Sequence, residues 1–140
     1  MHLSLKARHI PGRVVVGAFI LDSGVGKLSA DAATAEQMHG FAAGSYPMLA
    51  RIPQQTFVRL LAAGEITLGT ALLLPVVPTL VAGAGLTAFS AGLLGLYLRT
   101  PGMRKPHSLA PTEQGTPLAK DAWMTAMGLG FVIDALASRD

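Results

Sequence analysis

The stretch FVRLLAAGEITLGTALLL, from Phe57 to Leu74, decides how the rest of the chain should be interpreted. It belongs to an apolar segment, residues 56–74, whose only charged residues are Arg59 and Glu65. A helix of about 20 predominantly apolar residues is long enough to cross the hydrocarbon core of a bilayer. A carboxyl group midway along such a helix is costly in lipid, so it should face other helices. The stretch therefore predicts a transmembrane helix with a polar site near its centre.

Three further segments, residues 10–28, 79–98 and 118–137, have a similar length and are mainly apolar. Residues 79–98 carry no charge at all, and only a short turn containing Pro75 and Pro78 precedes them. Such a short connection predicts an antiparallel hairpin with the helix before it. The sequence thus predicts an all-α, polytopic membrane protein, a four-transmembrane-helix bundle that forms a single domain over the whole chain.

The composition supports a lipid environment. Hydrophobic residues make up 51% of the chain and charged residues only 14%, whereas soluble domains carry about 25% charged residues. The net charge of +3 comes mostly from residues near predicted helix ends, which favours contact with anionic lipid over nucleic-acid binding. The chain has no cysteine, so disulfides, thiolate metal sites and cysteine catalysis are excluded. We therefore expect the lipid bilayer as a partner and no nucleic acid.

Two long connections separate the predicted spans. Between the first and second spans, Asp31 can cap a short helix over residues 32–43, which predicts an interfacial or re-entrant segment. The second connection, residues 99–117, is rich in proline and is expected to be an irregular loop. The N-terminus loosely resembles a signal peptide, but Asp22 and Lys27 interrupt its apolar part. An uncleaved first span is therefore the expectation.

Small residues recur every four positions in the last two spans. This spacing lets helix backbones approach closely in a membrane. It predicts a helix-packing stripe in each span, made of Ala84, Ala88 and Gly92 in the third and of Ala126 and Gly130 in the fourth.

The charges within the spans form the candidate polar site. Glu65 is expected to be protonated or paired with a cation inside the bundle. Arg59 lies six positions away, which is not a neighbouring position on one helix face, so Lys27 from the first span is the more plausible partner. Asp22 points nearly opposite to Lys27 and faces another helix or the headgroup region. A structural tie and a proton or ligand site both remain open interpretations of these four residues.

Other charged and polar groups give no sign of catalysis. Arg13, like Lys27, is expected to anchor the first helix at the interface, because a long stem allows the charge to reach it. The histidines are His2, His9 and two in the long connections, and none lies within a span. This placement argues against haem held inside the bundle, and the histidines lack metal-ligand spacing. The sequence therefore predicts no catalytic residues, no metal and no cofactor.

The chain resembles the DoxX family of small four-helix bacterial membrane proteins over roughly residues 13–98. The resemblance lies in the pair Gly26-Lys27 that closes the first span, in MHGFAAGSYP from Met38 to Pro47, and in the central Glu65 followed by Gly69. It implies a four-helix fold, a multi-pass location in the bacterial inner membrane and an association with quinone-coupled redox chemistry. A bound quinone is the one cofactor that the resemblance makes possible.

These observations lead to three hypotheses about function. The first is an integral membrane accessory subunit of the DoxX type, which associates with other subunits of a larger redox or respiratory complex. The second is a quinone-linked oxidoreductase subunit in which Glu65 takes up protons. The third is a small transporter or lipid-binding protein that uses Glu65 and Lys27 as a polar site within the bundle.

Overall fold

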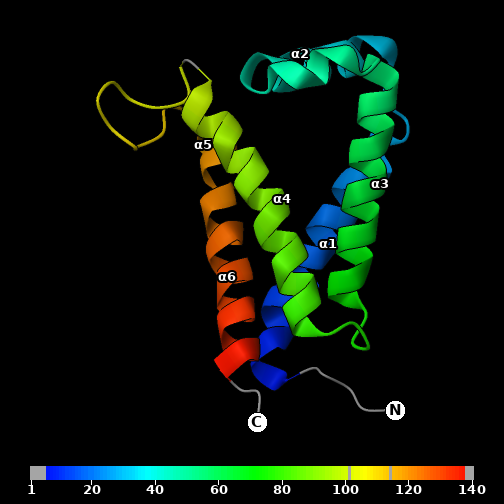
Figure 1. Cartoon of the computed structure of the whole chain (residues 1–140), viewed down its shortest axis with the longest axis vertical. Coiled ribbons are helices and arrows are strands. Elements are labelled where there is room, and N and C mark those ends of the chain that lie inside the picture. Colours follow the sequence, from blue (N-terminus) through cyan, green and yellow to red (C-terminus); the bar gives the residue numbers. More distant parts are fainter. Residues whose placement is uncertain (1–5, 101, 114, 138–140) are drawn as a thin grey trace. The chain divides into compact units, whose positions relative to one another are not determined.

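The computed structural model describes residues 6–100, 102–113 and 115–137, and these residues are helical apart from connections and one isolated bridge (Figure 1). The chain divides after Thr79 into two compact units. The α-helices are α1 (Ile10–Lys27), α2 (Ala32–Ser45), α3 (Gln54–Leu73), α4 (Thr79–Arg99), α5 (Thr116–Ala119) and α6 (Asp121–Ala137). The predicted all-α class is confirmed for the described residues.

Among the described residues, α3 and α4 are the helices that are long and apolar enough to cross a membrane. Their 20 and 21 residues correspond closely to the predicted segments 56–74 and 79–98. Helix α1 has 18 residues, three of them charged, and α6 has 17 residues. The total of four spans therefore stays a prediction.

In the first unit, α1 packs along α3 (Figure 1). Glycines make this contact close: a Cβ atom placed on Gly69 would lie 2.7 Å from the backbone nitrogen of Leu21 and 2.8 Å from the carbonyl oxygen of Gly17. Real Cβ atoms do not approach so closely, so only glycine fits there without separating the helices. The side chains buried most deeply along the two helices include Val16, Ile20, Val58, Ala62 and Leu72.

Helix α2 fills most of the connection between α1 and α3. Its first turn begins as the sequence predicts, because the Asp31 side chain accepts a hydrogen bond of 2.8 Å from the backbone N–H of Thr34. The imidazole of His39 lies 2.8 Å from the carbonyl oxygen of Leu49 and edge-on to the ring of Phe57. These contacts attach α2 to the start of α3, and its position at a membrane interface stays a prediction.

In the second unit, α4 and α6 also meet through glycine (Figure 1). A Cβ atom on Gly83 would lie 2.7 Å from Cβ of Phe131, and one on Gly128 would overlap Thr87. Beyond them the hydroxyl oxygen of Thr125 lies 3.0 Å from that of Ser90 and 2.9 Å from the carbonyl oxygen of Asp121 in its own helix, so its single proton is shared between these two acceptors.

The predicted packing stripes do not form the α4–α6 contact, and their role in other helix contacts stays a prediction. All five of their residues are exposed, and a Cβ atom on either of the two predicted glycines would meet nothing within 4 Å. Several stripes of small residues run along α4, and spacing alone does not show which one faces the neighbouring helix. The exposed residues are Ala84, Ala88, Gly92, Ala126 and Gly130.

The described residues of the connection after α4 form turns, bends and one isolated bridge before α5, as expected for an irregular loop, and specific hydrogen bonds hold them in place. Arg104 and Pro111 form an antiparallel bridge, next to which the backbone N–H of Lys105 donates to the carbonyl of Ala110 at 2.8 Å. The hydroxyl of Tyr97 donates to the carbonyl of Leu109 at 2.6 Å and so attaches this small hairpin to α4.

Candidate functional site

The candidate site lies between α1 and α3, where a carboxyl group is enclosed by apolar helix surfaces. Glu65 occupies the middle of α3 and is only 5% exposed. Ala62, Gly69 and Leu72 lie three, four and seven positions away and are buried on the same side of the helix. The side of α3 that carries Glu65 is therefore the one that packs against α1.

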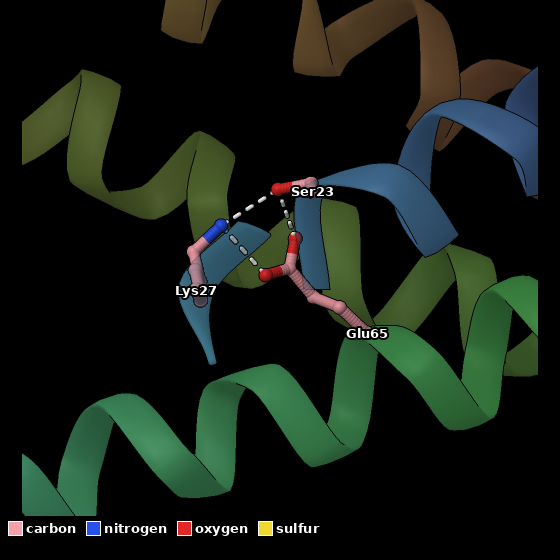
Figure 2. A network of polar contacts seen from close by, with 3 residues as sticks. All are labelled: Ser23, Lys27 and Glu65. Atoms are coloured by element: carbon pink, nitrogen blue, oxygen red, sulfur yellow. Dashed lines mark hydrogen bonds and ion pairs between the residues drawn. The ribbon is translucent and has the colours of Figure 1, made fainter. Parts of the chain in front are cut away.

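Two side chains of α1 bind the carboxylate (Figure 2). The Lys27 ammonium nitrogen lies 2.7 Å from Oε1 of Glu65 and donates to the hydroxyl oxygen of Ser23 at 2.6 Å. The Ser23 hydroxyl in turn donates to Oε2 of Glu65 at 2.9 Å. The three residues form a closed network, and each carboxylate oxygen faces a different side chain of α1.

The contact between Lys27 and Oε1 of Glu65 is mainly electrostatic. Oε1 accepts no hydrogen bond of good geometry although the ammonium is at ion-pair distance, so the pairing follows from charge and proximity. Lys27 belongs to the last turn of α1, where the helix dipole favours a positive charge. Its side chain keeps 17% exposure, so the ammonium is only partly removed from the surroundings of the helix end.

Gly24 creates the space for this network. A Cβ atom at Gly24 would lie 2.9 Å from Cβ of Glu65 and 2.9 Å from the backbone nitrogen of Ile66. Gly24 lies between Ser23 and Lys27 in sequence. The close approach of α1 to α3 at Gly24 therefore occurs at the level of the Glu65 carboxylate. The short distance from Ser23 and Lys27 to Glu65 therefore depends on a residue without a side chain.

The structure brings together two of the four predicted polar-site residues. Lys27 and Glu65 meet, whereas Arg59 and Asp22 are exposed and take no part in the network. The inclusion of the latter two is corrected by helix geometry. At about 100° per residue the directions of Arg59 and Glu65 differ by about 120° around α3, and Asp22 is rotated about 100° from Ser23 around α1.

Ser23 is a site residue that the sequence reasoning missed. It lies four positions before Lys27 in α1, which places both side chains on one helix face. This spacing could have identified Ser23 from the sequence. A side chain that contacts both Lys27 and Glu65 must lie on the face of the first helix that carries Lys27.

Arg13 also differs from its expected role as an interface anchor. It is 1% exposed, and its guanidinium donates to the carbonyls of Leu72 at 2.9 Å, Ala71 at 2.8 Å and Leu74 at 3.0 Å. A fourth donor bonds the Thr79 hydroxyl at 3.0 Å. The last carbonyls of a helix have no partner within it, and the planar fork of arginine suits several such acceptors. Arg13 therefore caps the C-terminal end of α3.

The chemistry available to the site is that of a buried, internally neutralised ion pair. Among the described residues, no group of three or more histidine, cysteine, aspartate or glutamate side chains could hold a metal ion. Comparisons with protein-family models, with curated proteins and with solved structures found no match.

Proposed function

We propose that the chain is a four-span protein of the bacterial inner membrane that serves as an accessory subunit of a larger redox or respiratory complex. The proposal joins the DoxX-like sequence features to the outward surface of the helices. In this role the helices contact lipid and neighbouring subunits, and the buried ion pair holds α1 against α3.

The observation that carries the proposal is the apolar outer surface of all four long helices. Large apolar side chains are exposed on each of them, up to 74% for Phe19 in α1 and 66% for Trp123 in α6. Apolar surface of this extent marks contact with a membrane or with another protein. The other exposed side chains of this kind include Leu60 in α3, Val81 in α4 and Ile133 in α6.

The polar contacts of α1 support its inclusion among the spans. Arg13, Asp22 and Lys27 would oppose the insertion of α1 on its own. In the structure Arg13 donates to α3 carbonyls and Lys27 pairs with Glu65, so two of the three charges have partners on α3. A helix pair therefore enters lipid at a lower cost than α1 alone.

The quinone-linked alternative assigns Glu65 the role of proton acceptor. Its carboxylate is already bound by Lys27 and Ser23, so a proton would compete with an ammonium group at 2.7 Å. This arrangement favours a structural role for the ion pair over proton uptake by Glu65. The two functions separate in membranes that contain Glu65→Gln at the same abundance as the original protein and still bound to the same subunits: unchanged quinone reduction contradicts the alternative, and loss of quinone reduction supports it.

The test of the accessory role is purification from native membranes under mild detergent. We expect the chain to require detergent for extraction and to migrate with a defined set of larger subunits, identified by mass spectrometry after crosslinking. A protein that is extracted by detergent but runs alone, with no partner recovered by crosslinking, would contradict the accessory role.

The span number can be tested independently because the chain contains no cysteine. Single cysteines at Ser29, Ser108 and Val76 would each lie at an exposed position in a connection between helices. Four spans place positions 29 and 108 on one side of the membrane and position 76 on the other. A membrane-impermeant thiol reagent should therefore label the first two from the same side and the third from the opposite side.

A further inference from the structure

Two hollows lie beside each other at the C-terminal end of α4, within the second unit. The larger, of about 590 Å³, is mainly apolar and falls in the size range of ligand pockets. Its walls include Leu94, Tyr97, Leu98, Leu109, Lys120 and Trp123. The smaller, of about 350 Å³, is lined by the polar loop that follows α4, including Arg104, Lys105 and His107.

The hairpin after α4 joins the two hollows. The Arg104 guanidinium donates to the carbonyl of Leu98 at 3.2 Å, so a wall residue of the basic hollow contacts a wall residue of the apolar one. Leu109 directly follows the residues that line the smaller hollow, and its carbonyl oxygen accepts a hydrogen bond of 2.6 Å from the Tyr97 hydroxyl of α4. His107 adopts a left-handed backbone (φ 56°), which turns the chain between the two walls. The hollows are therefore parts of one folded feature.

The electrostatic character of the feature selects its ligand. Arg104 and Lys105 line the smaller hollow, Lys120 lines the larger one, and no acidic residue is among the described residues that line them. The smaller hollow therefore attracts an anionic group, and the larger hollow beside it, the apolar groove, suits an apolar chain. Trp123 on the groove is the residue type that is enriched at the membrane interface, where such amphiphiles lie.

We propose that this feature binds one anionic phospholipid, with its phosphate in the basic hollow and an acyl chain along the apolar groove. The inference rests on the proposed placement of the chain in a membrane. Basic side chains beside a membrane helix attract anionic headgroups, and each contributes about fivefold to affinity. A zwitterionic lipid fits the groove equally well but gains little from the two cations.

Trp123 allows a direct test because it is the only tryptophan of the chain and lines the groove. The full chain is reconstituted into phosphatidylcholine vesicles that contain a minor fraction of dibrominated phosphatidylglycerol, or the same fraction of dibrominated phosphatidylcholine. Bromine quenches tryptophan fluorescence only in contact. We expect stronger quenching by the anionic lipid at equal mole fraction.

Two variants show whether the preference comes from this feature. The double variant Arg104→Gln/Lys105→Gln should lose most of the preference, whereas Arg51→Gln, which removes an exposed cation in the first unit, should retain it. All three side chains are exposed, and glutamine at position 104 retains a side-chain donor for the carbonyl of Leu98.

The possible failures are distinguishable. A chain that does not float with the vesicles contradicts the membrane placement itself. A chain that floats but is quenched equally by both brominated lipids overturns the lipid site and leaves the membrane placement intact. Equal loss of the preference in Arg51→Gln and in the double variant also overturns the site, because it shows a general charge effect.

Discussion

The α1–α3 contact and the α4–α6 contact are both close helix–helix contacts, but they contain different polar groups. Both depend on glycines that let the backbones approach, Gly69 in the first and Gly83 with Gly128 in the second. The first contact also contains an ion pair and the buried guanidinium of Arg13, whereas a hydrogen bond between two hydroxyls links α4 to α6.

This difference indicates where specificity resides. A charge inside apolar helices is tolerated only opposite its partner, so the network of Lys27 and Glu65 fixes how α1 slides and rotates along α3. The hydroxyl pair of Ser90 and Thr125 contributes less energy and has more alternative partners along each helix. Single substitutions at polar residues should therefore lower the free energy of unfolding more at the α1–α3 contact than at the α4–α6 contact.

The largest effect is expected from Gly69→Leu. A side chain there meets the backbone of Leu21 and Gly17, which cannot move aside, so α1 must separate from α3. We expect a loss of roughly 4 kcal/mol in the free energy of unfolding, measured by denaturation in mild detergent. Gly64→Leu on the same helix is the matched control, because a Cβ atom at Gly64 meets nothing within 4 Å. Equal stability of the two variants would contradict the close α1–α3 contact.

The ion pair should give the next largest effect. Glu65→Gln leaves an ammonium without its counter-charge, which we expect to cost about 3 kcal/mol, the low end for broken buried pairs because Lys27 keeps 17% exposure. Lys27→Met should cost a similar amount, and the double variant less than the sum of the two. Additive effects in this double-mutant cycle would show that the two side chains do not interact.

Arg13→Met tests the cap of α3. Removing the guanidinium leaves the carbonyls of Leu72 and Ala71 without their donors, with an expected loss of about 2 kcal/mol in stability. Arg13→Lys should restore only part of this loss, because one ammonium does not reproduce the planar fork. Arg59→Met, which removes an exposed cation from α3, should change stability little in the same assay.

The sequence predicted the elements better than the contacts between them. Helices α3 and α4 follow directly from long apolar runs with prolines between them, and the cost of a carboxyl group in lipid places Glu65 on a packed face. Lys27 was identifiable as a partner because its charge is opposite and it lies on another helix.

The remaining features depend on the register and rotation of one helix against another. Gly83 lies at the contact with α6, whereas Ala84, the next residue, is exposed on a different face of α4. The spacing of small residues does not specify which of these two faces packs against α6. The burial of Arg13 depends on the end of α3 arriving beside the start of α1. Neither feature leaves a local signal in a single sequence.

A smaller effect is expected in the second unit. Thr125→Val removes the hydroxyl that donates to Ser90 and should lower stability by about 0.6 kcal/mol, the average for such bonds between membrane helices. Thr67→Val is a suitable control, because its hydroxyl bonds only within α3, to the carbonyl of Ala63. A loss as large as that for Glu65→Gln would remove the contrast between the two contacts.

The smallest effect concerns the start of α2, outside both helix contacts. The backbone N–H of Thr34 holds the pKa of Asp31 below its ordinary value of 3.8 by stabilising the carboxylate. A carboxyl group with a lowered pKa in the folded state contributes its stability above the unfolded pKa, and this contribution is lost as the pH falls through the folded pKa. The first turn of α2 should therefore fray below about pH 4, detected by NMR at Thr34, while α1 and α3 stay paired. Asp31→Asn keeps the hydrogen-bond acceptor without its titration, so persistence of the same pH dependence in that variant would assign the fraying to another group.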